Sequence, residues 1–219
     1  LMSGFVVISL LAHLVGLARL IDDKSIEEEI LGFEITGITP IYEGWSKFLI
    51  ATLRTSGGEI VKREVEDHGC AAAVLPYDPE RRCAILVRQF RVPVRMVGET
   101  ENLLEAVAGI VEAESPEMAA SREAWEEAGL ELDALEPVGT HWTMPGLSTE
   151  RVALFLAPYS AAQRIADGGG LDHEHEEIAV VEISLDELAR CADDGRLNDL
   201  KTFALVQTLR LRRPELFGR

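Results

Sequence analysis

The segment SPEMAASREAWEEAG, residues 115–129, constrains the fold of this chain more than any other stretch. Ser115 before Pro116 is typical of a helix N-cap followed by the first helical residue, and Gly129 is typical of a helix end. The residues in between are mostly good helix formers. The sequence therefore predicts a helix over residues 116–128.

This helix carries an unusual charge pattern. Residues three and four apart are neighbours on a helix, so Glu123, Glu126 and Glu127 lie on one face. Each like-charged pair at that spacing costs about 0.2–0.5 kcal/mol, and the helix dipole disfavours negative charge in the last turn. Arg122 offsets only part of this repulsion. A solvated acidic face is the ordinary interpretation, but a bound cation would supply the missing offset.

The type of donor limits which cation could bind. Carboxylate oxygens without histidine or cysteine partners select hard cations, Mg²⁺ or Mn²⁺. Mg²⁺ commonly bridges protein carboxylates to the phosphates of a substrate. A glutamate-lined helix beside the glycine-containing loop that starts at Gly109 therefore indicates phosphate-ester or diphosphate chemistry.

Composition bounds the remaining possibilities. The 219 residues are enough for one large domain, or for one domain and a small one. A net charge of −17 and the lack of a basic patch argue against nucleic-acid binding. Cys70, Cys83 and Cys191 are far apart in the sequence, so they predict neither a disulfide framework nor a zinc site. This cysteine usage fits a reducing cytosol, and we expect a cytoplasmic protein.

Residues 4–20 are strongly apolar but short for a membrane span, and they include His13 and Arg19. We interpret this segment as a helix packed on the protein itself or on a partner, and membrane association is the less favoured interpretation. A targeting segment and an over-extended start are the alternatives.

The rest of the chain mixes strands and helices without strict alternation. This pattern favours an α/β sandwich with a mixed sheet over a Rossmann fold. Short β-like runs before residue 68 predict a small antiparallel sheet, and GGG at 168–170 predicts the start of a flexible loop. Helices are predicted from SLDELARCADDG and DLKTFALVQTLRLRR near the C-terminus. We expect three parts: an apolar segment (1–28), a small β domain (29–67) and the main domain (68–219).

The residues REAWEEAG, 122–129, resemble the REUxEExG core of the Nudix hydrolases. The match departs from the family pattern in two places. Only four residues separate Gly109 from Glu114, where the family has five, which puts the role of Glu114 in doubt. Ala124 stands where a larger aliphatic residue is common. Beyond the motif, AAVLPYDPERRCAILVRQFR, LLEAVAG and the position of Pro145 resemble the ADP-ribose and GDP-mannose pyrophosphatase branch.

The resemblance implies an α/β/α sandwich and a set of metal ligands. The ligands would be the carbonyl of Ala108 and the carboxylates of Glu123, Glu127 and Glu176, with Glu126 as a ligand or close support. Arg122 would pair with a neighbouring glutamate and fix its rotamer.

The same resemblance implies a general base in the acidic loop DHEHEEI. Alignment on Ile178 places the base at Glu174, and a shift of one residue would move it to Glu177. Arg91 would bind a diphosphate oxygen, since guanidinium suits phosphate geometry. Glu105 and Glu150 match carboxylates near the substrate, although both could be ordinary surface groups. The remaining implied contact is with a partner's nucleotide, through Arg63, and Trp45 or Phe48 could stack on its base or belong to a core.

These interpretations predict a homodimeric enzyme. It would hydrolyse a nucleoside diphosphate sugar, of the ADP-ribose or GDP-mannose type, to a nucleoside monophosphate and a sugar phosphate, with Mg²⁺ or, alternatively, Mn²⁺ as the ion. The alternative is a Nudix domain that binds nucleotide sugars without cleaving them and acts as a sensor. The shortened loop at 109–114 favours that alternative, and the intact acidic helix favours an enzyme.

Overall fold

A computed structural model describes residues 32–98, 103–171 and 177–218. The chain forms two compact units, which divide between Glu66 and Asp67. The apolar segment at 4–20 lies outside the described residues. In the part of the chain that the structure describes, no helix is long and apolar enough to span a membrane.

The first unit contains an antiparallel sheet of three strands in the order β1-β2-β3. The predicted small antiparallel sheet is thus confirmed. β1 is exposed along its whole length, and Ala51 on β2 is the one buried hydrophobic residue among those described in this unit. The sheet therefore has almost no core of its own. Its strands are β1 (Phe33–Glu43), β2 (Lys47–Thr55) and β3 (Ile60–Asp67).

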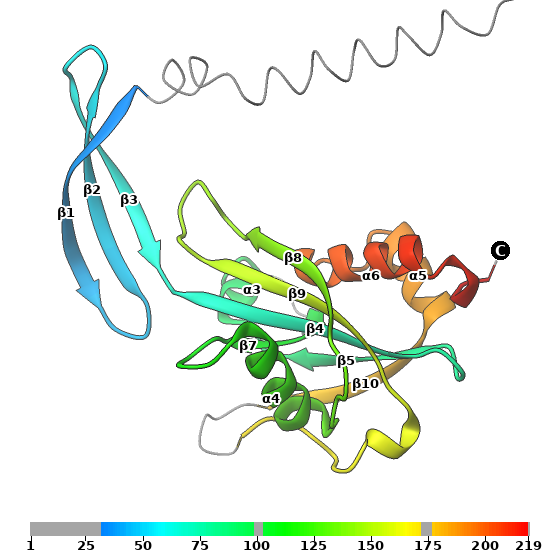
Figure 1. The fold of residues 1–219 in the computed structure, drawn as a ribbon. Coiled ribbons are helices and arrows are strands. Elements are labelled where there is room, and N and C mark those ends of the chain that lie inside the picture. The colour runs from blue at the N-terminus through cyan, green and yellow to red at the C-terminus, as the bar shows by residue number, and fades with distance from the viewer. Residues whose placement is uncertain (1–31, 99–102, 172–176, 219) are drawn as a thin grey trace, which may run out of the picture. The chain divides into compact units, whose positions relative to one another are not determined.

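The second unit is built on a mixed sheet of seven strands (Figure 1). The main path runs β10-β5-β4-β9-β8, with β6 beside β5 and β7 beside β4. β4 and β9 are parallel, and the other pairs are antiparallel. The strands are β4 (Cys70–Asp78), β5 (Cys83–Gln89), β6 (Leu103–Glu105), β7 (Val107–Ile110), β8 (Glu136–Trp142), β9 (Arg151–Pro158) and β10 (Ala179–Ser184).

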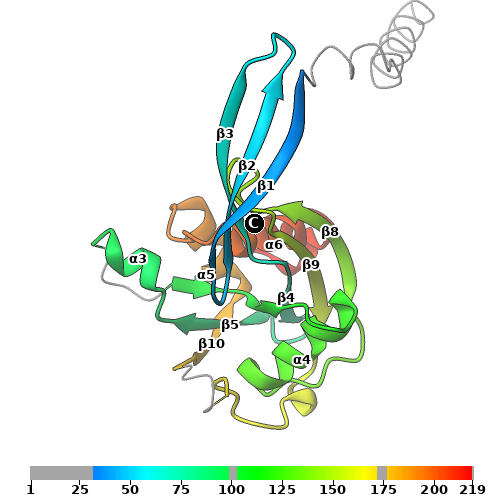
Figure 2. The ribbon, with the colours of Figure 1, turned by 90° about the vertical axis from the view of Figure 1, so that its left-hand side faces the viewer.

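Helices cover both faces of this sheet. α4 packs on one face, and α5 and α6 pack on the other (Figures 1 and 2). This three-layer arrangement confirms the predicted α/β sandwich with a mixed sheet. The helices are α3 (Val92–Met96), α4 (Pro116–Ala128), η1 (Ala161–Gln163), α5 (Leu185–Asp193), α6 (Leu200–Arg212) and η3 (Pro214–Leu216).

The position of β4 in the middle of the sheet explains why its sequence is apolar throughout. Successive side chains of a strand point to opposite faces. Leu75 and Tyr77 join the core under α5 and α6, whereas Ala72 and Val74 join the core under α4. Burial on both faces replaces the alternation of apolar and polar residues that a half-exposed strand would show.

Candidate active site

The helix that carries the acidic face begins and ends as the sequence predicts. The Ser115 hydroxyl oxygen accepts a hydrogen bond from the Met118 N–H at 3.3 Å, and Gly129 ends the helix at φ 66°. Ala124 is fully buried against the sheet. A larger side chain at this position would have to displace its neighbours, so the departure from the family pattern is matched by local packing.

Arg122 lies at the centre of the acidic cluster. Its Nη1 donates to Glu123 Oε1 at 2.7 Å and to Glu126 Oε2 at 2.9 Å. Its Nε and Nη2 donate to Glu114 Oε1 at 3.0 and 2.9 Å, and Nη2 also donates to the Ile110 carbonyl at 3.1 Å. Burial opposes the charge of Arg122, but its carboxylate partners outweigh that effect and raise its pKa. Arg122 thus binds three carboxylates and one main-chain oxygen.

Glu114 reaches this cluster although its loop is one residue short. Its carboxylate accepts from two nitrogens of Arg122 and its side chain is largely buried. The doubt raised by the loop length concerned this residue. The structure shows that the four intervening residues are enough to bring it to Arg122.

Two of the helical carboxylates, Glu127 and Glu123, contact β7. Glu127 is 2% exposed, and its Oε2 accepts from the Ala108 N–H at 3.1 Å. The Glu123 carboxylate lies against Gly109, where an added Cβ would come within 1.8 Å of Oε1. Only glycine leaves room for this approach. The structure therefore brings Ala108 and all three helical carboxylates to one place.

The chemistry of these groups fits a hard divalent cation, since every donor is oxygen. Among the residues that the structure describes, no three acidic, histidine or cysteine side chains form a ready metal-binding group. Arg122 bonds to two of the carboxylates, and the predicted fourth ligand, Glu176, lies outside the described residues, as does the predicted base Glu174.

A second cluster surrounds Glu105, which is 2% exposed. Arg91 donates to its two oxygens from Nε at 2.8 Å and from Nη2 at 3.0 Å, and Lys201 donates at 2.5 Å. Burial alone would raise the pKa of Glu105, but the bonds and charges of Arg91 and Lys201 outweigh it and lower that pKa. Arg91 and Glu105, two of the residues predicted to contact substrate, therefore form one ion pair.

Residues 67–204 match the sequence profile of the NUDIX domain, which is more than half of the chain. The chain belongs to the NUDIX family. It is 42% identical over 163 residues to the GDP-mannose pyrophosphatase of Cronobacter sakazakii, covering 73% of this chain and 84% of that protein. The Pectobacterium atrosepticum protein of the same name is 38% identical over 163 residues, covering 74% and 83%.

Solved structures support the same fold. The crystal structure of an ADP compounds hydrolase superposes with a TM-score of 0.67 at 17% identity, covering 84% of this chain and 95% of that one. At that identity the likeness supports the Nudix fold alone. Nudix hydrolases generally use divalent metals, which agrees with the oxygen donors on α4.

The other predicted residues that the structure describes belong to parts of the chain outside α4. Glu150 precedes β9, and its Oε1 lies 3.6 Å from His68 Nδ1. Arg63 is exposed on β3, where its Nη1 donates to the Lys62 carbonyl. Trp45 is 81% exposed, so the alternative that it belongs to a core is wrong.

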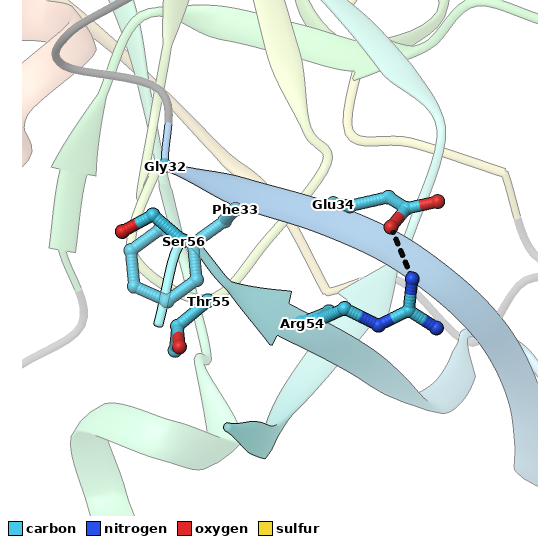
Figure 3. Close-up of a pocket in the computed structure, with 6 residues that line it drawn as sticks. All are labelled: Gly32, Phe33, Glu34, Arg54, Thr55 and Ser56. Atoms are coloured by element: carbon cyan, nitrogen blue, oxygen red, sulfur yellow. Dashed lines mark hydrogen bonds and ion pairs between the residues drawn. The ribbon is translucent and has the colours of Figure 1, made fainter. Parts of the chain in front are cut away.

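The N-terminal sheet contains a pocket (Figure 3). It contains an ion pair between Arg54 and Glu34 at 2.8 Å. None of the predicted site residues lines it. Its lining residues are Gly32, Phe33, Glu34, Arg54, Thr55 and Ser56.

Sequence reasoning missed Lys201, Asp199 and Thr202 at the start of α6. Lys201 bonds to Glu105 and to Asp199, and the Thr202 hydroxyl accepts from the Ala106 N–H at 2.6 Å. The contacts with Glu105 and Ala106 each join residues 96 positions apart, so no local pattern could have revealed them.

Proposed function

We propose that this Nudix chain hydrolyses the diphosphate linkage of nucleoside diphosphate sugars, releasing a nucleoside monophosphate and a sugar phosphate. The observation that carries the proposal is the acidic cluster of α4, in which Arg122 orders three carboxylates beside the buried Glu127. Relatives at 38–42% identity that bear the name GDP-mannose pyrophosphatase make GDP-mannose the first substrate to test.

The proposed metal ligands are Glu123, Glu126 and Glu127 with the Ala108 carbonyl and Glu176. Bound there, Mg²⁺ would stabilise the negative charge that develops on the diphosphate. Arg122 holds the side chains of Glu123 and Glu126 in fixed rotamers, so they need little rearrangement to receive an ion. Mg²⁺ is the proposed ion, and Mn²⁺ satisfies the same donors.

Arg91 and Glu174 have separate proposed roles. Arg91 would bind a diphosphate oxygen, and Glu105 together with Lys201 fixes the plane of its guanidinium. Glu174 would accept a proton from the attacking water, and such a base contributes roughly 10²–10⁴-fold to a rate. Glu150 is retained as a substrate contact.

The partner and the cell compartment are also proposed. The N-terminal sheet exposes Phe33, Ile35 and Ile38 on β1, and we infer that a second copy of the chain covers them. In that homodimer Arg63 would approach the partner's substrate. The three cysteines are free thiols in the structure, which supports a cytoplasmic enzyme.

A panel of nucleotide sugars tests the function. Purified protein is incubated with Mg²⁺ and GDP-mannose, ADP-ribose or a UDP-sugar, and products are separated by anion-exchange chromatography. We expect a nucleoside monophosphate from one of the first two substrates. Glu127→Gln is the control for contaminating hydrolase. Tight binding of a nucleotide sugar without any product would instead support the sensor alternative.

The observation that favoured a sensor was the shortened loop at 109–114. In the structure Glu114 still bonds to Arg122 through two nitrogens, so the loop length no longer favours that alternative.

A further inference from the structure

The glycine-rich segment 165–170 packs on the C-terminal end of α4 by main-chain hydrogen bonds. The last carbonyl groups of a helix have no partner within the helix and must find one elsewhere. Here the N–H groups of Gly129 and Leu130 bond to the carbonyls of Trp125 and Ala124, both at 3.0 Å. This turn leaves the carbonyls of Glu126 and Glu127 still in need of donors.

Those donors come from the glycine run that the sequence predicted only as a loop start. Gly169 N–H donates to the Glu127 carbonyl at 2.8 Å, and Gly170 N–H donates to the Glu126 carbonyl at 3.1 Å. Ile165 N–H donates to the Gly129 carbonyl at 2.9 Å. The segment therefore bonds to the main chain of the same residues whose carboxylates form the acidic cluster.

Glu127 is consequently held at both ends. Its carboxylate accepts from the Ala108 N–H, and its carbonyl accepts from the Gly169 N–H. Movement of the last turn of α4 along its axis would break both contacts. Donors at the negative end of the helix dipole also offset part of the charge repulsion there.

Glycine is required at position 168 for a steric reason. Its φ is +74°, and an added Cβ would lie 2.4 Å from the Glu127 carbonyl oxygen and 2.7 Å from the Ala128 Cα. Both are main-chain atoms, which cannot move aside without shifting the helix. Gly195, in the turn after α5, has a similar φ of +71°, and no atom of the described chain lies within 4 Å of an added Cβ there. An alanine would therefore be under similar backbone strain at either position, but only at position 168 would its Cβ clash with the main chain of α4.

We propose that the 165–170 segment is a positioning element for the metal-binding carboxylates of α4, with Gly168 as the residue that permits its close approach. This inference rests on the proposed function, because it assumes that these carboxylates bind a divalent ion. It assigns to the segment a role in metal affinity in addition to any role in stability.

The test measures Mn²⁺ binding by calorimetry on EDTA-stripped protein, without substrate. Gly168→Ala is expected to raise the Mn²⁺ dissociation constant by about 10–100-fold, the usual cost of losing groups that orient metal ligands. Gly195→Ala should lower the melting temperature through the same strain while leaving Mn²⁺ affinity at the wild-type value. A Mg²⁺ titration of turnover should show the matching shift in half-saturating concentration.

A second variant keeps the test decisive if Gly168→Ala fails to fold. At Gly169, which has φ +114°, the one contact of an added Cβ with the described residues would be the Ile178 carbonyl at 3.7 Å. Gly169→Ala should fold and still weaken Mn²⁺ binding, because strain at this φ displaces the Gly169 N–H, which donates to the Glu127 carbonyl. The inference is overturned if Gly168→Ala or Gly169→Ala binds Mn²⁺ like Gly195→Ala. If the wild-type protein binds no Mn²⁺ and cleaves no nucleotide sugar, the proposed function fails with it.

Discussion

At the scale of single residues, the carboxylates of Glu114, Glu123 and Glu126 share the guanidinium of Arg122, so negative charge remains in excess. Glu127 adds a further carboxylate with only 2% of its surface exposed. A buried anion is costly unless it is paired or coordinates a cation. Arg122 orders the cluster, the charge of Arg91 interacts with Glu127, and a divalent cation is the further partner that we propose.

The first prediction concerns Glu127→Gln. The glutamine side-chain oxygen can still accept from the Ala108 N–H, so the melting temperature measured in EDTA should match or exceed that of the wild type. Turnover should fall by at least about 10-fold, because weakening a metal ligand costs no less than losing a group that supports one. A fall in the melting temperature in EDTA would instead show that the carboxylate has a structural role.

A second prediction concerns the pH dependence of stability at Glu105. Its pKa is lower in the folded protein than in the unfolded chain, so its contribution is present above the unfolded pKa and is lost as the pH falls through the folded pKa. Glu105→Gln should therefore cost about 1.5–3 kcal/mol at pH 7, as for hydrogen bonds to charged groups. In urea unfolding, this difference from wild type should shrink below about pH 4. A difference that grows on acidification would contradict the assignment.

At the scale of elements, the N-terminus of α6 joins two parts of the candidate site. Asp199 caps the helix by accepting from the Thr202 N–H at 2.9 Å, and it also accepts from Lys201 and from the Thr202 hydroxyl. Lys201 also donates to Glu105, and the Thr202 hydroxyl oxygen also accepts from the Ala106 N–H. The cap thereby fixes the segment that precedes Ala108.

This arrangement predicts that removing the cap of α6 lowers stability more than removing the cap of α5. Ser184 caps α5 with a single bond, from the Glu187 N–H at 3.2 Å. Ser184→Ala should cost about 1 kcal/mol, the usual value for losing a cap. Asp199→Ala should cost more, about 2 kcal/mol, since Lys201 and Thr202 lose an acceptor as well. Urea unfolding of both variants measures the difference, and equal costs would show that the α6 network adds nothing to capping.

The limits of prediction from sequence also appear at this scale. The ends of α4 follow from Ser115, Pro116 and Gly129, because capping is a local property of the chain. The docking of 165–170 and the bond from Lys201 to Glu105 depend on pairing between distant segments, which no local pattern specifies. Residue counting raised doubt about Glu114 because the sequence does not show how far the Arg122 side chain reaches.

At the scale of the whole molecule, the first unit presents apolar side chains without a core to bury them. Phe33, Ile35, Ile38 and Ile41 on β1 are each more than half exposed. An exposed apolar surface of this kind marks an interaction site or risks aggregation. The long exposed strand β1 is consistent with the homodimer proposed above.

Light scattering at micromolar concentration should therefore give the mass of two chains. Ile38→Asp should give the mass of one chain, because it places a charge in the apolar surface, while Glu59→Asp in the β2–β3 turn of the same unit should remain dimeric. A wild-type monomer would count against a shared active site and against a role for Arg63.

The proposed function requires the acidic face of α4 to be a divalent-cation site for diphosphate hydrolysis. ³¹P nuclear magnetic resonance of GDP-mannose with EDTA-stripped protein, followed by stepwise addition of Mg²⁺, tests this most directly. We predict an unchanged diphosphate signal until Mg²⁺ is added, and then two phosphomonoester signals that grow in equal amounts. Phosphomonoester signals in EDTA alone, or an unchanged diphosphate signal at saturating Mg²⁺, would contradict it.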